Sequence, residues 1–556
     1  MSPPLLLLCV WAVALPLVVG LGAMTVRAAV GGRDASEPPS FLTLFLVGLG
    51  GALVVVQVWT VFAPGSTAWI PLGLLGLAGL LLVRRRVWAA SRRGNRDLVQ
   101  IAVTLAFAAW LAGTCAGPAL NPDNGLYYVQ SVRLARDFAL VRGVGNLHPL
   151  LAFNNDYFLL AALFEHGPLV DHGGPALNGL LLLPLVWTAV GGLVRLIRSQ
   201  PANGSASPLD LFQACLLGTA VDAAQRGFAS PAADNAVLAW SLGLALWVAD
   251  RRGTAGARWT LFALLGATGF CLKTSLVPAI AAAGFAELWL GLVEPRTAGA
   301  GRPGLVRPLV AAACLLIPHV VRSTLLSGFP LFPYPGLSVP TPWTLPHAKV
   351  DHLYRYIWDW ARDARSNYDP DTSSLRPDWR ERFLAREWLN NWGFLAPVIL
   401  IAVLSPAALV RRLRGRLTPA ELVFARLAVA TVIGLVCWWF LSPDLRFAGA
   451  MPWVLVAGLL ATAWPLTDRV SRTAATLVAA LVIGGALVGS ATSWRWPSGF
   501  PEPRHSNPAR RVQIGQGDWI NGWDQDGCWD YPCGWQVDPR IRTEVPADFG
   551  SGFRPE

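Results

Sequence analysis

Charged residues are scarce in this chain. They make up 14% of its 556 residues, whereas hydrophobic residues make up 54%, and the mean hydropathy is +0.45. Soluble domains carry about 25% charged residues, so the composition excludes an ordinary soluble protein. Lysine is nearly absent, with only Lys273 and Lys349, and the net charge of +11 therefore comes from arginine. The composition predicts an all-α integral membrane protein.

Long apolar runs recur along nearly the whole chain. Each is about 17–25 residues long and able to cross a hydrocarbon layer of about 30 Å. We expect about 14 (12–14) transmembrane helices, and the segment 208–221 is the weakest because it is short and contains Gln213. The predicted spans are 4–22, 41–63, 67–84, 99–116, 175–194, 208–221, 235–249, 258–272, 275–293, 307–323, 394–410, 419–441, 449–466 and 473–492.

Arginines gather in short connections at alternate ends of the predicted spans. Two such groups are Arg84, Arg85 and Arg86, and Arg411, Arg412 and Arg414. This distribution is the positive-inside pattern of membrane proteins, not the basic face of a nucleic-acid-binding protein. It places the arginine-rich connections in the cytoplasm and the N-terminus outside. The first apolar run has no basic residues before it, so we expect no cleaved signal peptide.

This topology divides the chain into six segments. N-terminal transmembrane helices (1–116) are followed by an extracytoplasmic loop with interfacial helices (117–174) and by further transmembrane helices (175–323). A second extracytoplasmic loop (324–393) leads to the C-terminal transmembrane helices (394–493) and a short, irregular, Trp-rich extracytoplasmic tail (494–556). In the second loop, Leu353, Ile357 and Trp360 recur at helical spacing opposite Arg355, Asp359 and Arg362, which predicts an amphipathic interfacial helix.

Most cysteines lie in or beside apolar runs, where they act as small packing residues. Cys528 and Cys533, in "CWDYPC", fall instead in the tail that the topology places outside. Disulfides persist outside the cytoplasm, so we expect these two residues to form one. A zinc site is the weaker alternative, because zinc usually takes four ligands and no histidine lies nearby.

The stretch "NPDNGLYYVQSVRLARD" begins at Asn121 and follows a predicted outward crossing. Its apolar residues recur at threes, which predicts a helix on the membrane surface that starts near Asp123. Asp or Asn at such a start is often only a helix cap. The alternative is a functional carboxylate at the outer end of the bundle.

Further polar residues lie at the same predicted face of the membrane. Each one alone is explained by capping or by a side chain that reaches the interface, but together they suggest an outward-facing polar cavity. The candidate substrate-binding residues are Asn124, Tyr127, Tyr128, Gln130, Asn146, His148, Asn154, Asn155, Asp234, Lys273, Arg322 and Arg446.

Such a cavity suits sugar transfer from a lipid-linked phosphate. A carboxylate would take the proton from the acceptor hydroxyl, and Asp123 is the candidate. Cationic groups would hold the phosphate and stabilise the leaving group, and Lys273, Arg322 and Arg446 are the candidates. No Asp-x-Asp pair accompanies Asp123, so no metal ligands and no definite cofactor are predicted; a divalent metal stays an open alternative.

The motifs "DNGLYYVQ", "GVGNLH", "AFNN", "SPAADN", "SGFPLFPYPG", "SPDLRF" and "CWDYPC" run in order from Asp123 to Cys533. This set resembles a family of uncharacterised bacterial polytopic membrane proteins with the patterns D-x-G-L-Y-x-x-Q and G-L-G-N-L-H. That family is similar in layout to the GT-C glycosyltransferases, which use polyprenyl-phosphate sugars and carry a catalytic acid in an early extracytoplasmic loop. The resemblance implies that Asp123 is this acid.

The resemblance also implies the partners and the location. The donor would be a polyprenyl-phosphate-linked sugar, the acceptor a glycan, lipid or protein, and membrane lipid would surround the bundle; no nucleic acid is expected. The location would be the bacterial inner (cytoplasmic) membrane, with the active side facing the periplasm or exterior. Three alternatives stay open: a lipid-linked saccharide flippase or other transporter, a surface-polysaccharide ligase or polymerase, and a non-enzymatic assembly role.

Overall fold

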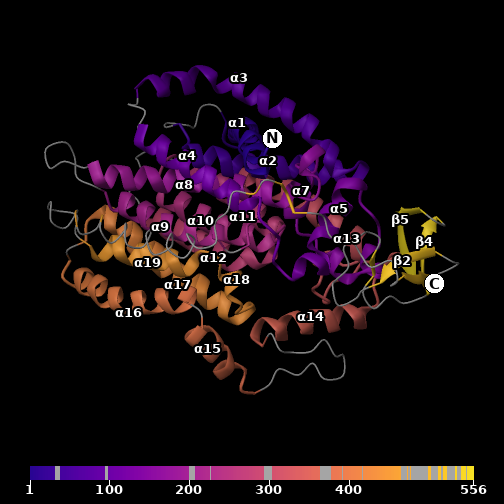
Figure 1. Cartoon of the computed structure of the whole chain (residues 1–556). Helices are drawn as coiled ribbons and strands as arrows, with labels where there is room; N and C mark the ends of the chain where they lie inside the picture. Colours follow the sequence, from indigo (N-terminus) through magenta and orange to yellow (C-terminus); the bar gives the residue numbers. More distant parts are fainter. Residues whose placement is uncertain are drawn as a thin grey trace.

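The computed structural model shows a bundle of long apolar helices with short helices and strands gathered at one end (Figure 1). It describes residues 1–31, 38–93, 98–198, 207–225, 227–293, 304–363, 377–390, 392–415 and 417–464. Beyond these it describes 473, 476, 497, 499–501, 511–514, 518–522, 533–534, 540–545 and 548–555. The long helices are α1 (Pro3–Val30), α2 (Phe41–Phe62), α3 (Trp69–Arg93), α4 (Leu98–Cys115), α8 (Gly173–Arg198), α9 (Pro208–Gln225), α10 (Ala233–Ala249), α11 (Ala255–Leu272), α12 (Val277–Val293), α13 (Val306–Ser327), α16 (Trp392–Leu413), α17 (Pro419–Leu441) and α19 (Met451–Ala463).

A helix lies at every predicted span except 473–492, most of which falls outside the described residues. In the part of the chain that the structure describes, ten helices are long and apolar enough to cross a membrane. The helices α10 and α19 are apolar but have only 17 and 13 residues. The helix α9 is long enough, but it contains Asp210 and Gln213, which lower its apolar character. The chain is therefore a multi-pass membrane protein, and its bundle consists of α-helices.

The helices differ in how much of their surface the protein itself covers. In the most apolar part of α8, 72% of residues are buried, against 22% in the span that includes α3 and 11% in α16. Figure 1 accordingly shows α3 and α16 at opposite edges of the bundle, with α8 and α10 between them. Apolar side chains exposed on these outer helices, such as Leu74 and Val403, match the hydrocarbon of a bilayer.

Arginine–carboxylate pairs tie the helices together at one end of the bundle. Arg195 near the end of α8 bonds Asp210 at the start of α9, with a 2.7 Å separation between Nε and Oδ1. Arg258 at the start of α11 bonds Glu287 near the end of α12, and Arg411 bonds Glu421 across the α16–α17 connection. These residues belong to the connections that the sequence assigns to the arginine-rich side.

The opposite end, which we call the loop end, carries the short elements. They are η2 (Asn124–Tyr128), α5 (Val129–Asp137), α6 (Val144–Leu147), η3 (Pro149–Ala152), α7 (Tyr157–Ala162), η4 (Gly167–Leu169), η5 (Thr274–Leu276), α14 (His347–Arg362), α15 (Trp379–Asn390) and α18 (Leu445–Ala448). A further short element, η1 (Gly65–Ala68), packs against α5. The loop between 117 and 174 thus contains the short helices that its sequence predicted.

The amphipathic helix predicted in the second loop is α14, but its polar face differs from the prediction. Leu353 is buried and Arg355 is exposed, as expected. Asp359 and Arg362 were expected on the exposed face and are buried. Arg362 stacks on Trp358, 3.7 Å from the ring centre, and donates to the carbonyl of Phe440 at 2.7 Å. This end of α14 therefore packs against α15, where Arg362 also lies 5.6 Å from the ring centre of Trp379, and bonds the end of α17.

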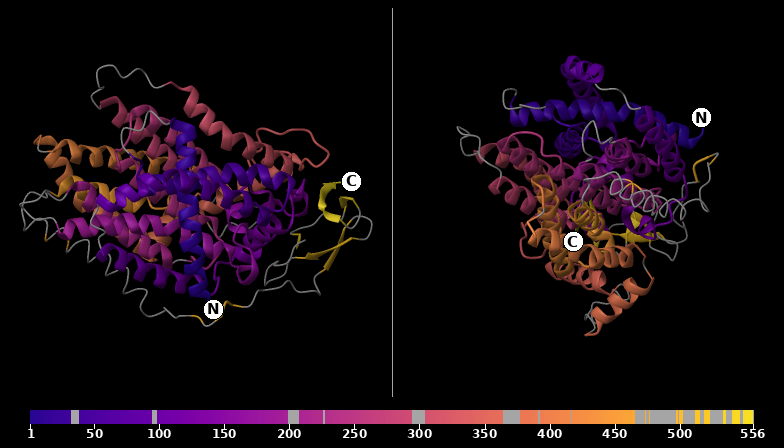
Figure 2. Two further views of the ribbon diagram at one scale, coloured as in Figure 1. Left: turned by 90° about the horizontal axis from the view of Figure 1, so that it is seen from above. Right: turned by 90° about the vertical axis from the view of Figure 1, so that its left-hand side faces the viewer.

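The tail, predicted to be irregular, contains strands. One sheet consists of β1 (Arg511–Ile514), β2 (Asp518–Gly522) and β3 (Cys533–Gly534). A separate antiparallel pair consists of β4 (Ile541–Val545) and β5 (Asp548–Pro555). Both strand groups lie at the loop end (Figure 1; Figure 2, left). The predicted disulfide lies outside the described residues, since Cys528 is not described and only the backbone of Cys533 is.

Candidate functional site

Asp123 stands at the start of η2, eight residues after the end of α4. Its side chain makes no cap bond to the helix, so the capping explanation does not account for it. Instead, the backbone N–H of Asp123 donates to Oδ1 of Asn121 at 2.9 Å, which turns the chain at this point. The carboxylate of Asp123 can therefore contact side chains of other segments.

Those segments bring Arg446 and Asp234 to Asp123. Arg446 Nη1 lies 3.3 Å from Asp123 Oδ2 and 3.9 Å from Asp234 Oδ2. The hydroxyl of Tyr128 lies between the two carboxylates, 2.9 Å from Asp234 Oδ2 and 3.3 Å from Asp123 Oδ2. The Tyr128 hydroxyl can donate its one proton to only one of these carboxylates at a time, and the shorter distance favours donation to Asp234. Lys273 Nζ bonds the other oxygen of Asp234. We call Asp123, Asp234, Lys273 and Arg446 the ionic cluster.

Aromatic and acidic groups hold Arg446 in place. Its guanidinium lies 4.7 Å from the ring centre of Trp360 on α14, and its Nε lies 3.3 Å from Asp444 Oδ1. Burial disfavours the charged guanidinium, but Asp444, Asp234 and the other nearby acidic groups outweigh burial and raise the pKa of Arg446. Arg446 therefore stays charged. Burial, together with Asp234, also raises the pKa of Tyr128 well above its usual value, so Tyr128 stays a hydrogen-bond donor.

The ionic cluster has an open side and a closed side. The side chains of Asp123 and Arg446 are 25% and 34% exposed, whereas those of Asp234 and Lys273 are each 11% exposed. Lys273 also packs 4.9 Å from the ring centre of Phe447. A ligand would thus reach Asp123 and Arg446 first, with the Asp234–Lys273 pair beneath them.

The motif "GVGNLH" serves the structure of the loop. Gly143 adopts a φ of +63°, and a Cβ there would lie 2.1 Å from the carbonyl oxygen of Phe553. Asn146 donates to the carbonyl of Trp343 at 2.8 Å. His148 Nε2 contacts the carbonyl of Leu126 at 3.1 Å, and burial lowers the pKa of His148 to about 3, so it is neutral and donates. These contacts explain Asn146 and His148 without a substrate.

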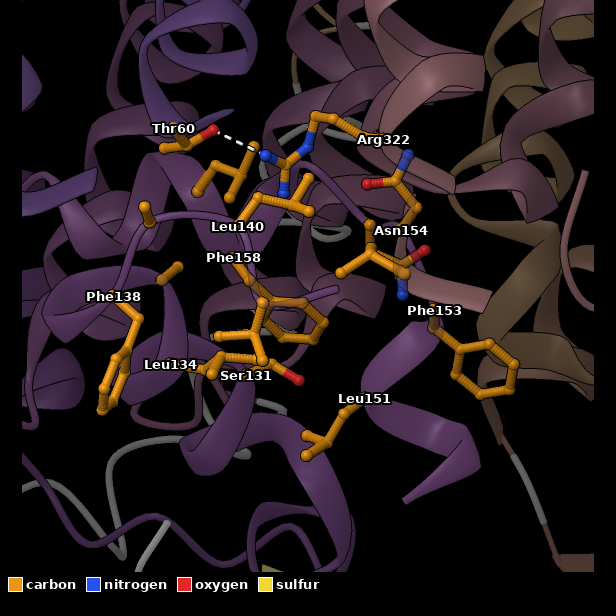
Figure 3. A pocket seen from close by; sticks show the side chains of 16 residues that line it. Thr60, Ser131, Leu134, Phe138, Leu140, Leu151, Phe153, Asn154, Phe158 and Arg322 are labelled. Carbon is orange, nitrogen blue, oxygen red and sulfur yellow. Dashed lines mark hydrogen bonds between the residues drawn. The ribbon is translucent and has the colours of Figure 1, made fainter. Parts of the chain in front are cut away.

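Of the other predicted residues, three lie in a pocket separate from the ionic cluster: Asn154, Asn155 and Arg322. Arg322 donates to Thr60 Oγ1 at 2.6 Å, and Asn154 donates to the carbonyl of His319 at 2.7 Å. Both line a cavity of about 50 Å³ that Asn155 also lines. Figure 3 shows Thr60, Arg322 and Asn154 on one side of this pocket, away from Phe138 and Leu151. Arg322 therefore does not complete a phosphate clamp with Lys273 and Arg446.

Aromatic rings stand between the pocket and the ionic cluster. Tyr127 packs on Phe153 and on Phe158, with ring centres 5.7 and 6.1 Å apart, and Tyr128 packs on Phe158 at 5.8 Å. Phe153 and Phe158 also line the pocket. Tyr127 and Tyr128 are thus wall residues; the Tyr128 hydroxyl bonds the acids of the ionic cluster, and the Tyr127 hydroxyl lies near enough to interact with Tyr128 and with Asp123.

Two further candidates lie close to this wall. Asn124 Nδ2 bonds Ser230 Oγ at 3.2 Å, which ties η2 to the segment before α10. Gln130 is fully buried in α5. Asn124 and Gln130 are therefore buried within the loop around the ionic cluster and do not lie on its open side.

Sequence reasoning missed Trp360 and Asp444 as partners of Arg446. Asp444 belongs to the same "SPDLRF" motif as Arg446, and Trp360 lies on the predicted apolar face of α14, so both carried a signal. The spacing of apolar residues predicts which face of α14 is buried, but not which other segment packs against that face. Sequence reasoning also did not show that Asp156, Cys271 and His319 meet in a second polar group, whose ligand atoms lie within 4.8 Å of one another.

Comparison with known proteins gives a family but no activity. No curated protein and no solved structure matches the chain. One family model matches residues 5–453, which include both loops and every residue of the ionic cluster. The chain belongs to this family, described as a domain of unknown function (DUF8201).

Proposed function

We propose that this protein is a membrane glycosyltransferase that moves a sugar from a polyprenyl-phosphate donor to an acceptor hydroxyl, with Asp123 as the general base. The observation that supports the proposal best is the meeting of Asp123 with Arg446, 323 positions away, in a partly exposed cluster. The reaction needs a carboxylate and a cation side by side at the end of an apolar bundle, and this cluster supplies both.

The proposed reaction uses the open side of the cluster. The donor phosphate would bind Arg446 and compete with Asp123 for its guanidinium, which leaves the carboxylate free to accept a proton. The acceptor oxygen attacks the anomeric carbon while the bond from that carbon to the phosphate oxygen breaks. The proton of the acceptor passes to Asp123, and the phosphate leaves with the electron pair, stabilised by Arg446 and by Lys273 beneath it.

The surroundings fit a lipid-linked donor. The isoprenoid chain would lie against the apolar helices, and α14, which places Trp360 on Arg446, would cover the sugar. By the arginine pattern, the loop end would face the periplasm or exterior of a bacterial inner membrane. The acceptor, whether glycan, lipid or protein, would approach from that side.

The position of the ionic groups favours transfer over transport. Asp234 lies in the first turn of α10 and Lys273 directly after α11, so the cluster lies at helix ends. Transporters place ionisable residues near the middle of the membrane on broken helices. A polysaccharide ligase or polymerase would use the same cluster with a different donor.

Asp123→Asn tests the proposal. We expect the variant to insert and fold, because Asp123 makes no cap bond and Asn keeps its shape, but to lose transfer of radiolabelled sugar from polyprenyl-phosphate donors in proteoliposomes. Asp137→Asn is the matched control and should keep activity, because Asp137 lies in the same loop, is 45% exposed and pairs with Arg136 rather than with the ionic cluster. Full transfer by Asp123→Asn would remove Asp123 as the base. Donor moved across the bilayer without transfer would support a flippase instead.

A further inference from the structure

A buried polar group next to the site combines a thiol, an imidazole and a carboxylate. Asp156 precedes α7, Cys271 lies in the last turn of α11, and His319 lies in α13. All three are buried, and their ligand atoms lie within 4.8 Å of one another. We propose that Asp156, Cys271 and His319 bind a zinc ion that joins these helices beneath the ionic cluster.

The donor atoms match the ligands that zinc prefers. Structural zinc sites take cysteine sulfur, histidine nitrogen and carboxylate oxygen in a tetrahedral set of four. Among the described residues, two buried oxygens of this group have no hydrogen-bond partner: Oδ1 of Asp156 and Oε1 of Gln57 on α2. An orphaned buried oxygen is costly, and a cation would satisfy both. Gln57 Oε1 would then be the fourth ligand.

The remaining contacts hold these ligands in position. The other carboxylate oxygen of Asp156 accepts a bond from Gln57 Nε2 and lies 3.2 Å from His319 Nδ1. The backbone N–H of Asp156 donates to the carbonyl of Cys271 at 2.9 Å, which fixes α7 against α11. The thiol of Cys271 lies 3.8 Å from the carbonyl of Leu315 and also interacts with the side chains of Gln57 and Asp156. Ligand orientation by such secondary bonds is a regular feature of zinc sites.

Charge balance favours a divalent ion at this depth. A thiolate and a carboxylate buried together would repel each other and lose their hydration. Zinc with one thiolate, one carboxylate, a neutral imidazole and an amide oxygen has no net charge. The alternative is that Arg322, one turn after His319 on α13, compensates Asp156 and that Cys271 stays a thiol.

Metal analysis of the full-length protein distinguishes these cases. We expect wild-type protein, purified in detergent through a tag without histidine, to contain about one zinc per chain. Protein stripped by a chelator and given Co²⁺ should show the near-ultraviolet sulfur-to-cobalt absorption of a thiolate ligand. Cys271→Ser should abolish this absorption, and His319→Gln should lower metal content about tenfold or more.

Cys215→Ser is the matched control, because Cys215 is also a buried free cysteine but lies in α9, away from the group. It should keep both the metal and the absorption. Folded wild-type protein without zinc and without a cobalt–thiolate band would overturn the proposal even if the variants fail to fold, and so would a band that persists in Cys271→Ser. Neither result bears on Asp123, so this inference stands or falls apart from the proposed transfer.

Discussion

Arg446 is the side chain on which most of the ionic cluster depends. It contacts both acids of the cluster and stacks on Trp360. We expect Arg446→Gln to lower transfer by about 100-fold, the order seen when one stabilising donor is removed from a transition state. Arg446→Lys keeps the charge but loses the planar stacking, so it should retain intermediate activity.

Arg355→Gln is the control for these variants. Arg355 lies on the exposed face of α14 and pairs only with Asp351, one turn earlier. Transfer rates should be unchanged in this variant. Equal losses for Arg355→Gln and Arg446→Gln would mean that general surface charge, and not the cluster, carries the effect.

Glu165, in the loop before α8, makes stability depend on pH. Burial raises its pKa from 4.5 to about 7, although Glu165 accepts bonds from the backbone N–H groups of Asp171 and Gly173. In the unfolded chain, where Glu165 is exposed to water, its pKa has the ordinary value of 4.5. The neutral carboxyl therefore favours the folded state below about pH 4.5, and this contribution, roughly 3 kcal/mol, is lost as pH rises to about 7.

Thermal unfolding of detergent-purified protein across this pH range would measure the loss. Glu165→Gln cannot ionise, so its midpoint should change less between these pH values, while Asp351→Asn, exposed on α14, should follow the wild type. A wild-type midpoint that rises with pH would contradict the assignment to Glu165.

The sequence predicted part of the site. Topology alone placed Asp123, Asp234, Lys273 and Arg446 at one end of the bundle, because each adjoins the same end of a predicted span, and the structure joins them. It also grouped Arg322 with them, since end-of-span placement does not resolve neighbouring pockets. The meeting of Asp156, Cys271 and His319 could not be predicted, because they lie on three different segments.

Among the long helices, α1 and α2 meet through a glycine. A Cβ at Gly48 would lie 2.0 Å from the carbonyl oxygen of Val18, so any larger residue forces the two helices apart. We expect Gly48→Leu to destabilise the protein by about 1–3 kcal/mol, measured as a lower thermal midpoint in detergent. Gly73→Leu on α3, where a Cβ meets nothing within 4 Å, should be tolerated. Similar midpoints for both variants would mean that the α1–α2 contact contributes little.

The hydrophobic pattern predicted the long helices and the presence of short helices in the first loop, but not the buried polar side of α14 or the tail strands. Long apolar runs give helices because every backbone group must be bonded inside the membrane. The polar side of α14 was misassigned, because Asp359 and Arg362 look solvent-exposed in the sequence but are buried in the structure, where Arg362 donates to the carbonyl of Phe440 on α17. The tail strands were missed, although β1 pairs with the next strand β2, and β4 with the next strand β5.

The molecule as a whole has two unlike ends. Arginine–carboxylate pairs close one end, while the ionic cluster, the amphipathic α14 and the tail strands occupy the other. This asymmetry follows from arginine placement and could be predicted. The way the two loops and the tail fold over one another depends on long-range contacts that no local pattern records.

The docking of β5 has a consequence for the timing of folding. Phe553 donates its backbone N–H to the carbonyl of Arg142 at 2.9 Å, and its carbonyl lies 3.4 Å from Asn146 Nδ2, 407 positions earlier. A ribosome makes residue 142 long before residue 553, so the first loop cannot complete its contacts until β5 has been synthesised. A nascent chain stalled or cut short just before that strand would leave the helices in the bilayer with this loop still open.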